Sequence, residues 1–287
     1  MRNNFLIDTE RVRIALDKVM LKTANPTKVH QPSPVGSGDR FTANMIDADS
    51  IAKTRKLLDR AIVYAWYTVK SERKPPTLTH TQWVWRLAGA YHLTHSYPPL
   101  IEEAQERFAL AGRKSLSQWA AQKAIEERGH DRLALLDIQS MGYKAEAVVE
   151  ALIPPSAVAL VNYLAQSVYA TDPIGCVGYS YTLERLATGI KEKHIQPIEA
   201  LLPPRNRATR CLRAHSGVGV DVEHVEETVE MVAGLAPQER VRVARACYET
   251  ALLYFSPAKE DDISEEELQH ILKPLESRTH LQAKVDI

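Results

Sequence analysis

The stretch that decides the fold is IEERGHDRLALLDIQSMG, residues 125–142. Its apolar residues recur at helical spacing, and Gly142 is typical of the position just after a helix. The pattern predicts one helix that Ser115 caps and that runs to Gly142. Glu127 and His130 are three residues apart, so both side chains would project from one face of this helix.

A carboxylate and an imidazole at this spacing are the groups that helical bundles use to hold iron or manganese. Gly129 lies between them, although glycine lowers helix propensity by about 1 kcal/mol relative to alanine. We therefore expect another group to approach the backbone closely at Gly129. The alternative is a solvated charged face, because Glu-x-x-His also occurs by chance.

The rest of the chain predicts further helices and no strand, because Val, Ile and Thr never form alternating runs. These helices are expected from Asp47 to the stop at Lys74, from Thr79 or Thr81 onward, over 154–171, 173–193, 205–214, 221–235 and 238–255, and from Ser264. Pro98 and Pro99 would kink the second helix or restart it at Leu100. We expect one all-α domain over 46–280.

Residues 1–45 differ from the rest, because 23–40 is rich in Pro, Gly, Ser and Thr. We interpret 1–45 as a flexible arm and linker, with an ordered strap as the alternative.

Composition excludes several classes of protein. Lys+Arg and Asp+Glu both count 36, so the formal net charge is zero and nucleic acid is not expected as a partner. No apolar stretch approaches the ~20 residues of a membrane span, and the apolar core at 5–7 is too short for a signal peptide. Three widely spaced cysteines are typical of a reducing compartment. We expect a cytoplasmic protein without a membrane partner.

A second acid–His pair lies in HSGVGVDVEH, residues 215–224, where Asp221 and His224 are again three residues apart. A third carboxylate, Glu184, ends the apolar and aromatic stretch PIGCVGYSYTLE (173–184). If Glu184 faces the core it must be paired, protonated or metal-bound. The alternative is a surface glutamate beside Arg185.

These segments together resemble the haem-oxygenase-like diiron oxidases, whose fold is shared with TenA-like proteins. The stretch 125–142 resembles their central helix, and YHLT (91–94), 173–184 and 215–224 are similar to three further segments. The resemblance covers roughly residues 80–255, and only Glu-Glu-x-Gly-His-Asp is specific. It implies a haem-oxygenase-like helical bundle, a homodimer, one or two Fe(II) ions, and O2 as co-substrate. It also implies oxidation of a small amino-acid-like or fatty-acid-like metabolite in a biosynthetic pathway.

The resemblance also implies site residues. Its metal ligands would be Glu127, His130, Glu184, His215, Asp221 and His224. Glu184 would be a further or bridging ligand that takes part in catalysis, and His92 would line the catalytic site.

Two departures from the family pattern matter. The family spaces the later ligands as His-x3-Asp-x2-His, whereas this chain has His-x5-Asp-x2-His, which would put His215 about 180° from His224 on a straight helix. Gly217 and Gly219 tolerate unusual backbone angles, so we expect a break that returns His215 to the site. The alternative is a buried or capping histidine.

The second departure concerns the first ligand helix, where the family has a carboxylate. This chain offers Glu102, Glu103 and Glu106 in a stretch that looks solvated, with His92 and His95 as other candidates. A missing carboxylate would weaken the second iron.

Four further residues are candidates for substrate binding. Arg210 or Arg213, in a basic run with Arg205 and Arg207, could hold a substrate carboxylate, although most such runs are solvated. Tyr179 and Tyr181 could line the pocket, although aromatic residues at helical spacing are more often core.

Two other functions remain open at this point. One is a metal-free member of the fold, a hydrolase or lyase with Cys176 or Cys211 as nucleophile. The other is a non-catalytic helical binding protein.

Overall fold

A computed structural model describes residues 47–69, 78–203, 206–217, 221–256 and 261–277, with only the backbone at 221–223. These residues form α-helices, one short 3-10 helix and no strand, which confirms the all-α prediction. The predicted arm, 1–45, lies outside the described residues. The helices are α1 (Ala48–Val69), α2 (His80–Leu110), α3 (Lys114–Glu127), α4 (Asp131–Ser140), α5 (Ala145–Ala151), α6 (Pro155–Tyr169), α7 (Gly175–Ala187), α8 (Glu192–Glu199), α9 (Arg210–Ala214), α10 (Asp221–Ala233), α11 (Pro237–Phe255), α12 (Glu265–Leu272) and the 3-10 helix η2 (Lys273–Leu275).

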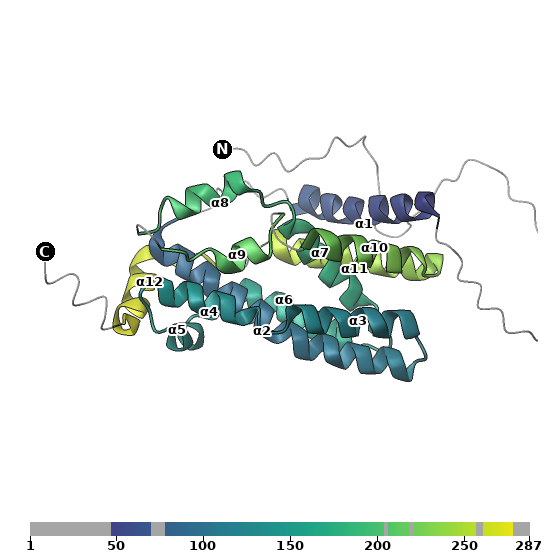
Figure 1. The fold of residues 1–287 in the computed structure, drawn as a ribbon, viewed down its shortest axis with the longest axis horizontal. Coiled ribbons are helices and arrows are strands. Elements are labelled where there is room, and N and C mark those ends of the chain that lie inside the picture. Colours follow the sequence, from purple (N-terminus) through teal and green to yellow (C-terminus); the bar gives the residue numbers. More distant parts are fainter. Residues whose placement is uncertain (1–46, 70–77, 204–205, 218–220, 257–260, 278–287) are drawn as a thin grey trace, which may run out of the picture. The chain divides into compact units, whose positions relative to one another are not determined.

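Helix α2 packs against α3, α4 and α6, while α11 packs against α1 and α7 (Figure 1). Helix α10 lies against α7, α1 and α3, so it joins the two sets. The larger apolar core lies among α1, the second half of α2, α3, α6, α7, α10 and α11. A smaller core lies among the first half of α2, α4, α5 and α12.

Helix α2 begins as predicted but does not break. Thr79 is its N-cap, and its hydroxyl accepts a hydrogen bond from the Gln82 backbone N–H at 3.1 Å. The predicted restart at Leu100 is wrong, because one helix of 31 residues runs through Pro98 and Pro99; the alternative, a kink within a continuous helix, stays a prediction. Tyr97 and Ile101 on either side are buried in the larger core. We attribute the continuity to this packing, which offsets the cost of each proline, about 3 kcal/mol.

The predicted helix over 115–142 is instead two helices. Helix α3 begins at Lys114 rather than after a Ser115 cap and ends at Glu127, and α4 begins at Asp131. Gly129 between them has φ +87°, a left-handed conformation that other residues adopt only with strain. Apart from its chain neighbours, no atom of the described residues lies within 4 Å of the Cβ that a side chain would add, so no described protein group makes the expected close approach. Gly142 follows α4 with φ +92°, as predicted for its position.

The ends of two later helices also differ from the predicted ones. The helix predicted over 173–193 ends at Ala187, and α8 follows as a separate helix. Helix α9 has only five residues, fewer than 205–214. Ser264 caps α12, with its hydroxyl accepting from the Glu267 backbone N–H at 3.1 Å.

No single described helix is long and apolar enough to span a membrane. Helices α5 and α6 pass this test only as a pair, and they are bent by 81° at the break between them.

Candidate metal centre

The centre of the site is the carboxylate of Glu127, which ends α3 and is 7% exposed. His130 Nδ1 lies 2.9 Å from Glu127 Oε2, and His215 Nε2 lies 3.8 Å from the same oxygen. The two imidazole rings are 4.8 Å apart, edge to face. One carboxylate and two imidazoles therefore converge, with ligand atoms all within 4.8 Å of one another.

Glu127 has the charge that a cation site needs. Burial alone would raise the pKa of its carboxyl group, but the hydrogen bond with His130 and the charges of His215, His130 and Lys123 outweigh burial. The pKa of Glu127 therefore lies below its ordinary value. At neutral pH the group is an anion, the form that binds a metal.

A second group shares Glu127. Glu184 on α7 and His224 on α10 are each 8% exposed, and their ligand atoms also lie within 4.8 Å of one another and of Glu127. Glu184 is thus buried, not a surface residue beside Arg185. Both groups combine carboxylate with imidazole, and these are the ligand types that suit Fe(II).

Sequence reasoning missed Lys123 and Glu126, two residues of α3 beside these groups. The Lys123 side chain is 1% exposed, and its Nζ lies 3.1 Å from Glu184 Oε1 and 3.2 Å from Glu126 Oε2. Glu126 Oε2 also lies 3.3 Å from His224 Nε2. The available signal was position, since Lys123 precedes Glu127 by one helical turn and therefore shares its face.

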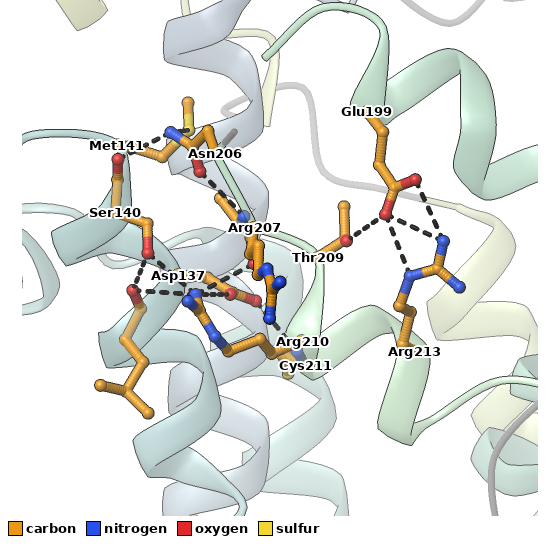
Figure 2. Close-up of polar contacts among 12 residues, drawn as sticks. Asp137, Ser140, Met141, Glu199, Asn206, Arg207, Thr209, Arg210, Cys211 and Arg213 are labelled. Atoms are coloured by element: carbon orange, nitrogen blue, oxygen red, sulfur yellow. Dashed lines mark hydrogen bonds and ion pairs between the residues drawn. The ribbon is translucent and has the colours of Figure 1, made fainter. Parts of the chain in front are cut away.

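His215 reaches Glu127 because other groups hold the short helix α9 in place. Asp137 on α4 is fully buried, and it accepts hydrogen bonds from Arg210 Nη1 at 3.0 Å and from the Cys211 backbone N–H at 2.9 Å (Figure 2). At the other end of α9, Arg213 pairs with Glu199 and with Glu192 of α8. His215 follows α9 directly as its C-cap residue.

The glycine after this turn is required by a close approach. The Gly217 backbone N–H donates to Ile190 O at 2.9 Å, and a Cβ on Gly217 would lie 2.4 Å from Thr188 O. Helix α9 ends at Ala214 and α10 begins at Asp221. His215 and His224 are therefore not on one straight helix. Gly219 and the Asp221 side chain lie outside the described residues.

The candidates for the ligand of the first ligand helix lie on α2, and their described contacts are with residues other than Glu127. His92 Nε2 lies 3.1 Å from Leu152 O, and His95 is exposed and paired with Asp131. Glu102 pairs with Arg128, Glu103 pairs with Arg107, and Glu106 is exposed.

The residue of α2 that does lie near the site is Tyr97. Its hydroxyl lies 2.6 Å from Ser180 Oγ. Burial, together with the charges of Glu184 and Glu127, raises the pKa of Tyr97 well above its usual value.

The four substrate-binding candidates make contacts within the protein. Tyr179 stacks between Tyr97 and Tyr163 in the core, and the Tyr181 hydroxyl donates to Asp59 at 2.9 Å. Arg210 and Arg213 make the ion pairs described above. All of these described partners are residues of the protein itself. A substrate role for any of the four stays a prediction.

Comparisons with known proteins find the fold in solved structures. No family model and no curated protein matches the chain. A domain of unknown function with a haem-oxygenase-like fold from Shewanella denitrificans is 21% identical, with a TM-score of 0.54, covering 80% of this chain and 94% of that one. A TenA homologue from Pseudomonas syringae is 12% identical, with a TM-score of 0.52, covering 70% and 89%. The chain therefore has the haem-oxygenase-like fold, which a TenA homologue shares.

Proposed function

We propose that this protein is a non-haem iron oxidase or oxygenase that acts with O2 on a small metabolite, amino-acid-like or fatty-acid-like, in a biosynthetic pathway. The observation that carries the proposal is the convergence of His130, His215 and Glu127. Two imidazoles and one carboxylate are the ligand set of many iron enzymes that use O2. A homodimer remains part of the proposal.

In this proposal Glu127, His130 and His215 hold Fe(II), with Glu184 and His224 beside them. The iron would supply O2 activation and the redox step. The hydrogen bond between His130 and Glu127 orients both groups before metal binding, and Asp137 does the same for His215 through α9. Burial of Glu127, Glu184 and His224 limits the access of water to these ligands.

The experiment is anaerobic loading with Fe(II), followed by desalting and an iron assay. Wild-type protein should retain iron, whereas His130→Ala should lose affinity by about 10- to 100-fold, the loss measured for removal of even a supporting group. His95→Ala is the matched control, since His95 is exposed and paired with Asp131. The loaded protein should then consume O2, and a panel of amino acids and fatty acids should accelerate this consumption.

Two results would contradict the proposal. One is wild-type protein that retains no iron after desalting. The other is equal iron retention by His130→Ala and wild type, which would place the metal elsewhere.

The metal-free thiol alternative has less support. Cys176 is fully buried, and burial raises the pKa of its thiol far above the ordinary value, so the nucleophilic thiolate is disfavoured. Cys211 is also buried, at the start of the short helix α9. A non-catalytic binding protein would bind iron without O2-dependent turnover of any candidate substrate, an outcome that the O2-consumption assay distinguishes.

A further inference from the structure

Lys123 is a buried cation inside the candidate metal centre. Its side chain is 1% exposed, and its ammonium group lies between the carboxylates of Glu184 on α7 and Glu126 on its own helix, α3. A buried ammonium is costly unless anions pair with it closely. Both distances, 3.1 and 3.2 Å, are those of direct ion pairs.

These ion pairs involve only one of the two ligand groups. Glu184 belongs to the group with Glu127 and His224, and Glu126 contacts His224 at 3.3 Å. A metal ion bound by Glu184 and His224 would therefore compete with Lys123 for Glu184, and it would lie close to a positive charge.

The charges among these residues match one divalent ion. Counting only the three carboxylates of Glu126, Glu127 and Glu184 and the ammonium of Lys123, the charge is −2. One divalent ion brings this to zero. A second would leave a surplus of positive charge in a buried region, where repulsion is poorly screened.

We propose that Lys123 takes the place of a second metal ion, so that this centre binds one divalent ion, held by Glu127, His130 and His215. The inference rests on the proposed metal-binding function. It states that one side chain, Lys123, determines how many metal ions bind. Iron loading of the wild type alone does not test this point.

The test is Mn(II) binding by wild type, Lys123→Met and Lys114→Met, measured by equilibrium dialysis and by electron paramagnetic resonance. Methionine is apolar and flexible enough to occupy the space of the lysine stem. Lys114 is an exposed lysine on the same helix and serves as the control. Wild type and Lys114→Met should bind one Mn(II) and give the spectrum of an isolated ion.

Lys123→Met should bind a second Mn(II) at least about tenfold more tightly than wild type does, because a like charge is removed. Its two ions should give the spectrum of an exchange-coupled pair. Its metal-free form should be less stable than wild type, since Glu126 and Glu184 lose their cation, and Mn(II) should raise its melting temperature more. If Lys123→Met does not fold, Lys123→Gln tests the same point, because it retains hydrogen-bond donors without the charge.

Two outcomes overturn the inference and leave the proposed function standing. They are two Mn(II) ions in wild type, and a single ion in both wild type and the folded Lys123 variants. No Mn(II) or Fe(II) in wild type would overturn the proposed function, and this inference with it.

Discussion

Removal of the Asp137 carboxylate should loosen His215, although Asp137 does not contact the proposed metal. Asp137→Ala leaves the buried Cys211 N–H without its acceptor, which costs about 1–3 kcal/mol. The ion pair with Arg210 is partly exposed to solvent and retains Ser140 as a partner, so its loss adds only about 0.5–1 kcal/mol. Together these losses should lower the free energy of unfolding by about 1.5–4 kcal/mol.

The same change should weaken metal binding, because a five-residue helix cannot hold its own position. We expect Mn(II) affinity to fall by about 10- to 100-fold, as for other groups that orient a ligand. Asp137→Asn should cost less, since its amide oxygen can still accept from Cys211 and burial already raises the pKa of Asp137. Asp131→Ala, at the start of α4, is the control.

Urea unfolding and Mn(II) titration measure the two effects. The reasoning is refuted if Asp137→Ala unfolds at the same urea concentration as wild type. It is also refuted if the variant is destabilised but binds Mn(II) as tightly as wild type.

Three further predictions can be tested separately. Gly129→Ala and Gly112→Ala, both at positive φ in open space, should each cost about 1–2 kcal/mol in urea unfolding, but only Gly129→Ala should weaken Mn(II) binding. Glu265 has a pKa below its ordinary value of 4.5 in the folded state despite partial burial, because Thr79 and Thr81 donate to it. Its stabilisation should be complete above pH 4.5 and lost as pH falls through the folded-state pKa, so Glu265→Gln should abolish that part of the pH dependence of unfolding. Cys176 should resist iodoacetamide in the folded protein at neutral pH, and rapid labelling would contradict its burial.

Local sequence signals were enough to predict much of the fold. Helical periodicity predicted an all-α chain, and the caps at Thr79 and Ser264 are where the side-chain chemistry indicated. The predictions failed at Gly129 and, for the restart of the helix, at Pro98-Pro99. In the first case a periodic pattern continues across a left-handed residue that ends one helix. In the second, core packing on both sides of the prolines outweighs their helix-breaking tendency.

The site was predictable only in part, for a related reason. Residue types and spacing indicated Glu127, His130 and His224, and the structure places Glu127 close to each histidine, in two separate groups. The role of Lys123 depends on α7 placing Glu184 against α3, a contact that joins residues 61 positions apart. Such contacts leave no local pattern in the sequence, and neither does the Asp137 contact that holds α9.

The central claim is that Glu127, His130 and His215 share one metal ion. Crystals grown with Mn(II) and measured at a wavelength where manganese scatters anomalously test it most directly. The account predicts a single anomalous peak within coordination distance of these three side chains, with Lys123 still paired to Glu184. A peak on Glu184 and His224 instead, two peaks, or none beside Glu127 would contradict it.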